Sequence, residues 1–236
     1  MTTSRVLLEK KRGGVTNTVV NEGQEIHIPL WVVDLDSFRR WTDQDEFPED
    51  GRIWWLRRGV WIDMSKEQLF THIQVKDQFT RVLGGLVERE GLGWYFSDGL
   101  LLTNVEAKMS GRPDGTFISE RSLDERKIRW VENHEGGYTE AEGTPDMVLE
   151  VVSRSSVRKD TVELFEAYWE AGIAEYWLVD ARKEPVRFDL YRHGEKGYVA
   201  SAKRAGWVRS RIFGKWFRLR RTKGPREYPN FALAIR

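Results

Sequence analysis

The sequence predicts an α/β protein with a mixed central sheet. One apolar, β-branched run covers residues 147–152, and a second covers residues 173–179. The segment between them has the signals of a helix that begins with Asp160 at its N-cap and ends at Gly172. Strand, helix and strand in this order form a βαβ unit with two parallel strands. The core is therefore expected to be α/β.

Residues 1–51 are expected to form an N-terminal extension. Short β-like patches occur within the first 32 residues, without clear periodicity. A short helix with acids in its first turn is expected from Asp34 to Trp41, followed by an acidic loop around Pro48.

The next segment combines a hairpin with a long helix. Residues 52–63 alternate around Gly59 and predict a β-hairpin. Residues 66–90 then predict the clearest amphipathic helix of the chain, although Gly84 and Gly85 weaken its second half. Its apolar residues recur near the helical period; they are Leu69, Ile73, Phe79, Val82, Leu83, Leu86 and Val87.

Further strands are expected on both sides of the βαβ unit. Before it, strand patterns cover residues 94–96, 99–105 and 116–118, and a charged linker follows at 120–143, with 128–131 as a further strand candidate. After it, strand patterns at 186–191 and 198–200 flank a turn, and two aromatic, basic strand candidates follow. The predicted regions are 1–51, a central domain at 52–192, and a β-rich C-terminal region at 193–236 that packs on the same domain.

Composition excludes several classes of protein. The 236 residues include no cysteine, which removes disulfides, thiolate zinc sites and cysteine nucleophiles. No apolar run approaches the roughly 20 residues that span a bilayer, and residues 1–12 lack the apolar core of a signal peptide. A cytoplasmic protein that does not span a membrane is the expectation.

Charge is unevenly distributed although the net charge is only +1. Acids dominate residues 34–50, and almost every charge after Lys196 is positive. Such a basic segment, interleaved with aromatic residues, is typical of a polyanion-binding surface, and a solvated cationic sheet face would have the same pattern. Its members are Trp207, Arg209, Arg211, Phe213, Lys215, Trp216, Phe217, Arg218, Arg220, Arg221 and Lys223.

The most informative residue is Glu150, a carboxylate within an apolar strand. An ionised carboxylate away from water costs several kcal/mol unless it is paired or coordinates a metal. Metal binding is the leading interpretation, and an internal ion pair with an arginine is the alternative.

A second metal ligand has to come from another strand. Asp146 lies on the same strand face as Glu150 but roughly 13 Å away, which is too far to share one ion. Asp114 follows a proline at the start of another apolar strand, and adjacent strands are about 4.8 Å apart. Two carboxylates at that separation suit Mg²⁺, which can polarise a phosphate and lower the pKa of a bound water, as phosphodiester hydrolysis requires.

Structural roles explain some of these acids equally well. Asp114 could be a turn aspartate after proline. Asp146 is more simply explained as a residue that bonds loop amides where its strand begins. The four histidines are too scattered to indicate a zinc site. His72 is best explained as a helix-surface residue, and Glu67 or Asp77 could supply an additional acid.

Several segments resemble one family. The residues are 145–153, Asp160, Tyr168, 171–173 and 175–180, together with 61–63, His72 and 112–114. In these segments the chain is similar to the bacterial Uma-two family of putative restriction endonucleases, over about residues 52–192.

The resemblance implies a fold, a reaction and a site. The family belongs to the PD-(D/E)XK nuclease superfamily, which implies a restriction-endonuclease-like mixed sheet flanked by helices, and Mg²⁺- or Mn²⁺-dependent cleavage of DNA, often by dimers. Asp114 resembles the motif aspartate and Glu150 the second acid, with the Val151 carbonyl as a third metal ligand.

The chain departs from the superfamily pattern at the lysine. Val152 occupies the position two residues after the acid, and Leu164 occupies the helical position used instead in the family. A lysine there offsets transition-state charge, a contribution worth several kcal/mol. Lys159 is the candidate replacement, with Arg154 and Arg158 as others, although a solvated loop position explains each of them more simply.

The sequence thus predicts a metal-dependent DNA endonuclease, with Asp114, Glu150, Asp146 and Lys159 as candidate catalytic residues. The alternative is a degenerate nuclease-fold protein that binds nucleic acid without cutting it. A third possibility is a protein-interaction module with a tryptophan-rich surface.

Overall fold

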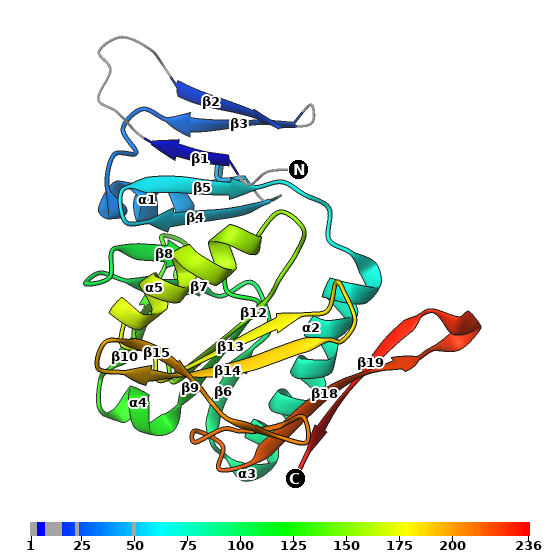
Figure 1. Cartoon of the computed structure of the whole chain (residues 1–236). Coiled ribbons are helices and arrows are strands. Elements are labelled where there is room, and N and C mark those ends of the chain that lie inside the picture. Colours follow the sequence, from blue (N-terminus) through cyan, green and yellow to red (C-terminus); the bar gives the residue numbers. More distant parts are fainter. Residues whose placement is uncertain (1–3, 8–15, 22–23, 49–50) are drawn as a thin grey trace.

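Two β-sheets with a helix between them form the centre of the molecule (Figure 1). The computed structural model describes residues 4–7, 16–21, 24–48 and 51–236. The expected α/β class and mixed sheet are confirmed. No helix among the described residues is long and apolar enough to cross a membrane.

The six-stranded sheet contains the predicted βαβ unit. Strands β12 and β13 are parallel neighbours, and β9 pairs antiparallel with β12. The order is β15-β14-β13-β12-β9-β6, with β6 (Gly93–Phe96), β9 (Gly115–Ser119), β12 (Met147–Val151), β13 (Glu175–Asp180), β14 (Arg187–Gly194) and β15 (Gly197–Ala200).

A seven-stranded sheet lies across α5 from the six-stranded sheet. It includes the predicted hairpin, whose two strands pair antiparallel. The order is β1-β5-β4-β8-β7-β11-β10, with β1 (Ser4–Leu7), β4 (Arg52–Leu56), β5 (Gly59–Asp63), β7 (Leu101–Asn104), β8 (Met109–Gly111), β10 (Ile128–Glu132) and β11 (Tyr138–Gly143).

Helix α5 (Leu164–Glu170) fills the space between these two sheets. Its residues Leu164 and Tyr168 share a buried cluster with Trp54 of β4 and Val148 of β12. The helix ends at Gly172, whose φ of +73° suits glycine, as expected from the sequence. Helix α5 therefore connects both sheets in one core.

A long helix covers the other face of the six-stranded sheet. It begins with a π-helical turn at Leu69–Ile73 and continues through α2 (Gln74–Phe79), a second π-helical turn at Thr80–Gly84 and α3 (Gly85–Glu90). Gly84 and Gly85 therefore do not interrupt it. Val75, Phe79 and Leu83 are buried against this sheet, as the amphipathic pattern predicts. Leu69 and Ile73 are exceptions, because they lie in the first turn and are 65% and 41% exposed.

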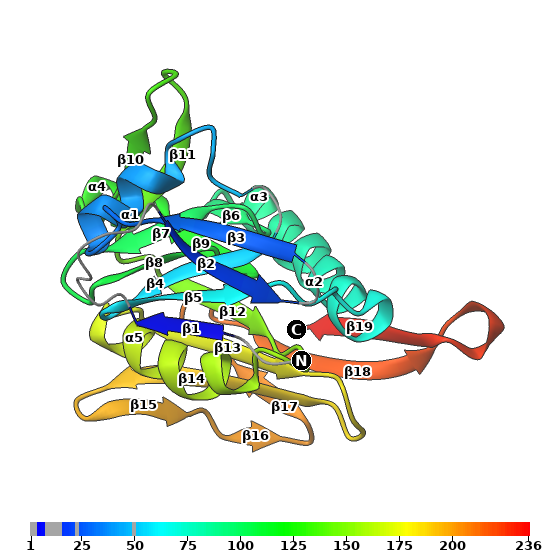
Figure 2. The ribbon, with the colours of Figure 1, turned by 90° about the horizontal axis from the view of Figure 1, so that it is seen from above.

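The same face carries a C-terminal sheet, which extends away from the body of the molecule as a long hairpin (Figures 1 and 2). Phe217 and Phe231 are buried in the core cluster that contains Phe79. The order is β16-β17-β18-β19, with β16 (Lys203–Arg204), β17 (Trp207–Arg209), β18 (Trp216–Lys223) and β19 (Pro229–Ile235); a short 3-10 turn covers Pro225–Glu227.

The N-terminal part packs on the outer face of the seven-stranded sheet. Strands β2 (Thr16–Asn21) and β3 (Gln24–Pro29) form a hairpin, and α1 (Leu35–Thr42) is the helix expected there. Asp34 caps α1 by accepting hydrogen bonds from Ser37. Phe38 and Trp41 of α1 are buried in a cluster with Trp55. The division of the chain into three regions stays a prediction.

The segment 120–143 is not a linker, and that expectation was wrong, whereas the strand expected at 128–131 is confirmed as β10. It forms helix α4 (Glu120–Asp124) and the β10–β11 hairpin, and β11 joins the sheet beside β7. Charges within the segment pair across the hairpin, as Arg129 and Glu142 do at 2.8 Å. Ile128 and Ala141 supply the buried side of the hairpin.

Candidate functional site

Asp114 and Glu150 come together where β9 begins and β12 ends. The expectation that their strands are neighbours is confirmed by the register Gly115 to Leu149. Asp114 immediately precedes β9, and its Oδ2 accepts a hydrogen bond of 2.8 Å from the Val151 amide. Both carboxylates are buried, at 3% and 2% exposure. The fold thus places two carboxylates from separate strands at one end of the sheet.

Glu150 lies between a phenol and an ammonium group. Tyr168 Oη donates a hydrogen bond of 2.6 Å to Oε1, and Lys159 Nζ is 3.7 Å from Oε2. Burial raises the pKa of Glu150 to about 8, although Lys159 acts in the opposite direction. The basic residue beside Glu150 is therefore a lysine, and not the arginine that the ion-pair alternative expected.

Lys159 is a buried member of this cluster. Its side chain is 2% exposed, its Nζ is 2.7 Å from Asp160 Oδ1, and it lies 4.8 Å from the centre of the Trp54 ring. Burial alone would lower the pKa of Lys159, but Asp160 and Glu150 raise it above its ordinary value. Lys159 is therefore a cation at neutral pH.

A solvated loop position for Lys159 was the wrong expectation, because the helical segment begins earlier than its capping signal indicated. Helical geometry starts at Val157, so Asp160 is not the N-cap but lies in the first turns with Lys159. Asp160 accepts a short hydrogen bond from Ser156. Arg154 and Arg158, by contrast, are exposed.

Two basic residues that the sequence did not indicate lie beside Asp114. Arg52 of β4 is 3.5 Å and Lys76 of α2 is 3.7 Å from Oδ1 of Asp114. Burial would raise the pKa of Asp114, but Arg52, Lys76 and the Val151 amide outweigh it, and the pKa lies below its ordinary value. Asp114 is therefore ionised at neutral pH.

His72 also belongs to this site and is not the helix-surface residue that was expected. It is 1% exposed, with Nε2 at 3.7 Å from Asp114 and Nδ1 at 3.3 Å from Glu67. Burial lowers the pKa of His72 to about 4, so the imidazole is neutral near pH 7. Glu67 thus lies at the site, whereas Asp77 pairs with Arg81 on the exposed side of the helix.

Asp146 is hydrogen-bonded elsewhere. It precedes β12, at the end of the strand opposite to Glu150, and accepts hydrogen bonds from the Ser119 amide at 2.7 Å and from Ser122 Oγ at 3.0 Å. These bonds tie the end of β9 and the start of α4 to β12. This geometry is that of a residue that bonds amides where its strand begins.

A cleft of about 1200 Å³ adjoins the cluster. Arg52 and Glu67 line it, as do Asp63 and Asp98, and Asp98 pairs with Lys76 at 2.6 Å. Arg52, which lines the cleft, contacts both Glu67 and Asp114, so the buried carboxylate of Asp114 lies directly behind the wall of the cleft.

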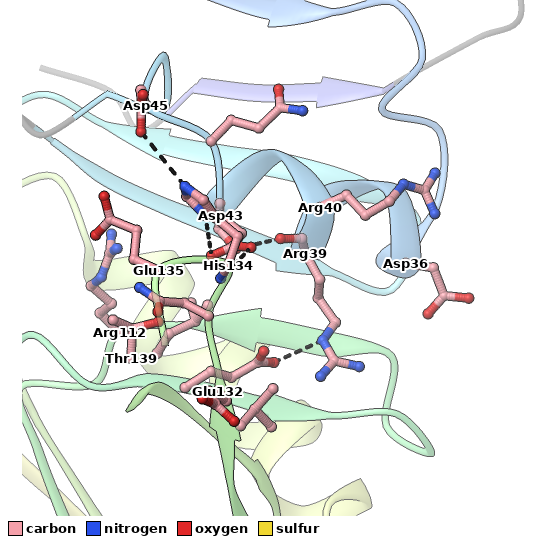
Figure 3. Close-up of a pocket in the computed structure, with 16 residues that line it drawn as sticks. Asp36, Arg39, Arg40, Asp43, Asp45, Arg112, Glu132, His134, Glu135 and Thr139 are labelled. Carbon is pink, nitrogen blue, oxygen red and sulfur yellow. Dashed lines mark hydrogen bonds and ion pairs between the residues drawn. The ribbon is translucent and has the colours of Figure 1, made fainter. Parts of the chain in front are cut away.

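A second acidic group lies at the surface beside α1 (Figure 3). Among the described residues, the one set of three potential metal ligands within 4.8 Å of one another is Asp45, His134 and Glu135, all exposed. The hydrogen bond that the His134 ring donates to Asp43 raises the pKa of His134. Because this favours an imidazolium in an ion pair, an acid and base cluster accounts for the group without a metal.

The buried carboxylates fit an oxygen-preferring divalent cation. Mg²⁺ is commonly held by one or two carboxylates and keeps several waters, and Asp114 and Glu150 offer such carboxylates. The raised pKa of Glu150 indicates that its carboxylate lacks a full counter-charge, which a bound cation would supply.

Comparison with known proteins agrees with this geometry. Residues 35–219 match the family Uma2, described as putative restriction endonuclease. No curated protein matches the chain. The chain is similar in fold to the crystal structure of a putative nuclease of the family DUF820 from Anabaena variabilis, with a TM-score of 0.57 at 15% identity, over 77% of this chain and 91% of that chain. The match to Uma2 covers most of the sequence and includes Asp114, Glu150 and Lys159, so the chain belongs to the Uma2 family, the Uma-two family that its motifs resemble.

Proposed function

We propose that the protein is a metal-dependent endonuclease that hydrolyses phosphodiester bonds of DNA at the Asp114, Glu150 and Lys159 cluster. The observation that carries this proposal is the convergence of two buried carboxylates and a buried lysine beside a large cleft. The description of the family as restriction endonucleases and that of the structural neighbour as a nuclease support it.

Asp114 and Glu150 would hold the cation, Mg²⁺ or Mn²⁺, together with the Val151 carbonyl. A divalent cation in such a site polarises a phosphate and lowers the pKa of water. The chain positions its ligands by two hydrogen bonds, from the Val151 amide to Asp114 and from Tyr168 to Glu150. Burial raises the pKa of Tyr168 well above its ordinary value, so the phenol stays a donor.

Lys159 would supply the positive charge that the superfamily obtains from a lysine two residues after the acid. Val152 at that position is buried in the apolar cluster between the sheets, and so is Leu164. Lys159 reaches Glu150 from the following helical segment instead. A fixed ammonium group there offsets negative charge that develops on a phosphate, a contribution worth several kcal/mol.

DNA would approach through the cleft, where the exposed Lys66 is available to phosphates. The basic C-terminal strands would contact the backbone elsewhere. Cutting both strands would involve a homodimer or two successive cuts. The absence of cysteine supports a cytosolic site of action.

One observation favours the alternative, a family member that binds nucleic acid without cutting it. Arg52 and Lys76 already lie at 3.5 and 3.7 Å from Asp114 and supply positive charge where a metal would otherwise do so. If these cations replace the metal, the site becomes a binding site alone.

Incubation of supercoiled plasmid with the protein in Mg²⁺, in Mn²⁺ and in EDTA separates the two functions. Wild type and Asp146→Asn should nick the plasmid with either metal and not in EDTA. Glu150→Gln keeps the shape of the side chain and should lose at least about 10² in rate. If neither wild type nor any variant nicks while wild type still retards DNA in a gel, the non-cutting alternative replaces the proposal.

A further inference from the structure

A concave site lined by four arginines lies among the C-terminal strands. Arg192, Arg204, Arg209 and Arg211 line it together with Ser201 and Trp216, and its volume is about 310 Å³. Since a water occupies about 30 Å³ in the liquid, the site has room for roughly ten waters, more than a single phosphate group needs. We name it the arginine pocket.

The guanidinium groups of this pocket have no acidic partner, although the backbone amide of Arg211 donates a hydrogen bond to Glu175. Nearby cations are paired, as Lys203 is with Asp189 at 2.6 Å and Lys215 is with Glu90 at 2.8 Å. Within the described ranges, none of the four pocket arginines forms an ion pair. Four like charges in one concavity repel one another, and a protein that retains them has a site prepared for an anion.

Hydrogen-bond donors in the pocket are also unmatched. Arg192 Nε and Ser201 Oγ are buried, and neither makes a hydrogen bond to any part of the chain that the structure describes. A buried donor without an acceptor costs about 1–3 kcal/mol, and a ligand with several acceptor oxygens removes that cost. Phosphate is such a ligand.

Tryptophans orient the surrounding guanidinium groups without neutralising them. Arg204 lies 5.8 Å from the centre of the Trp216 ring, and Arg236 lies 4.4 Å from that of Trp207, which also carries Arg218 at 4.6 Å. A cation–π contact fixes a guanidinium group but leaves its charge in place. The positive field of this face therefore remains available to a polyanion.

The pocket is separate from the Asp114 and Glu150 site. In the strand register, Arg192 lies opposite Glu175, the first residue of β13, whereas Glu150 lies opposite Leu178 near the end of that strand. Arg192 and Glu150 also lie on opposite faces of the sheet. Leu190, two residues before Arg192 and therefore on the same face, packs in the cluster with Phe79, whereas Glu150 accepts a hydrogen bond from Tyr168 in the cluster between the sheets.

We propose that the arginine pocket binds the phosphate groups of a nucleic-acid strand at a second site, remote from the carboxylate cluster. The choice of nucleic acid over a small phosphate ligand rests on the proposed function, because a nuclease acts on a polyanion longer than its active site. A phosphodiester strand also explains why the basic surface continues from the pocket to Arg218 and Arg236.

The test compares two double variants that remove equal charge. Arg209→Gln with Arg211→Gln alters the pocket, and Arg121→Gln with Arg126→Gln alters exposed arginines in and just after α4, outside the basic C-terminal strands. Binding of a labelled oligonucleotide is measured by fluorescence anisotropy in EDTA at several salt concentrations. The pocket variant should bind about tenfold more weakly near 0.1 M salt, and its slope of log K against log salt should fall by about 1.4 for a single strand or about 1.8 for a duplex. The control variant should stay within about twofold of wild type.

Inorganic pyrophosphate serves as the probe for a small phosphate ligand and should displace the oligonucleotide only in large excess. Equal weakening by both double variants overturns the proposal, and so does tight pyrophosphate binding without oligonucleotide binding. Because the assay contains no metal, its outcome is independent of cleavage. Equal weakening by both double variants with nicking intact refutes only the pocket, and weakening by the pocket variant alone without nicking by the wild type refutes only the nuclease.

Discussion

Glu150 shows how one buried carboxylate couples stability to metal binding. Its side chain is almost fully buried, and the ammonium group of Lys159 at 3.7 Å only partly offsets the charge of its carboxylate. A residue in this position is costly to an apolar core unless the charged form has a use. The free energy of unfolding should therefore depend on pH and on the concentration of divalent cations.

Stability without metal should decrease as pH rises. Burial raises the pKa of Glu150 to about 8 in the folded protein, whereas the unfolded chain has an ordinary value near about 4.3. Between these values the folded state holds a proton that the unfolded state has released, so the free energy of unfolding falls as pH increases. Thermal unfolding in EDTA between about pH 6.5 and about pH 8 checks this, because at lower pH the depressed pKa of His72, about 4 in the folded protein, changes stability in the opposite direction.

Glu150→Gln should remove most of that pH dependence, because glutamine does not titrate. Magnesium should raise the Tm of the wild type more at the upper end of the pH range, where the carboxylate is free to bind it. A wild-type profile as flat as that of Glu150→Gln would contradict the buried, proton-binding state of this residue.

Lys159 should contribute to both stability and cleavage. Lys159→Met removes the cation from between Glu150 and Asp160 and leaves two buried carboxylates without it. Breaking a buried ion pair in this way costs about 3–5 kcal/mol, which urea unfolding measures. The neighbouring Arg158→Met removes a charge that is 75% exposed and should change stability by less than about 0.5 kcal/mol. Similar losses of stability from both substitutions would show that the buried position of Lys159 does not determine its contribution to the free energy of unfolding.

At the scale of elements, the periodic segments were predictable and the contacts between distant segments were not. The hairpin β4–β5, the parallel pair β12 and β13, and the ending of α5 at Gly172 follow from alternation, apolar runs and a C-cap signal. The start of the helical segment was misplaced because Asp160 resembles an N-cap, whereas its carboxylate actually bonds Lys159 and Ser156.

Part of the candidate site was likewise predictable. Asp114 and Glu150 could be identified because acids are unusual beside apolar strands. Arg52 and Lys76 could not, since they reach Asp114 from β4 and α2, and their approach depends on an order of strands and helices that no local pattern encodes. For His72, the only signal was its family resemblance, because a histidine on an amphipathic helix is compatible with either face.

Glu175 should be the residue that attaches the C-terminal sheet to β13. Its carboxylate is 1% exposed and accepts hydrogen bonds from Ser210 Oγ at 2.7 Å, the Arg211 amide at 2.6 Å and Trp177 Nε1 at 3.0 Å. Glu175→Ala leaves these donors unsatisfied and should lower the free energy of unfolding by at least about 3 kcal/mol.

Urea unfolding, with Glu184→Ala as control, measures this effect. Glu184 is 66% exposed and pairs with Arg221, so its removal should cost less than about 0.5 kcal/mol. If Glu175→Ala is as mild as the control, the packing of Phe213 and Phe217 alone holds the sheet in place.

At the scale of the whole molecule, two sheets and the helix between them gather charged groups at one end of a shared core. Asp114 comes from the start of β9, Glu150 from β12, Lys159 from the helical segment before α5, and Arg52 from the other sheet. The arginine pocket lies on the opposite face, lined by residues of β14 in the six-stranded sheet and of β16 and β17 in the C-terminal sheet. A nucleic acid that reached both sites would follow the surface of the molecule around the end of the sheet.

The central claim is that the buried carboxylates, and not the exposed group beside α1, hold the metal. Calorimetric titration of Mn²⁺ into wild type, Glu150→Gln and Glu135→Gln tests it most directly. Glu150→Gln removes one carboxylate from the buried site, and Glu135→Gln removes one from the exposed group. The account predicts that Glu150→Gln abolishes the tightest binding event and that Glu135→Gln leaves it unchanged. Retention of that event in Glu150→Gln together with its loss in Glu135→Gln would contradict the account.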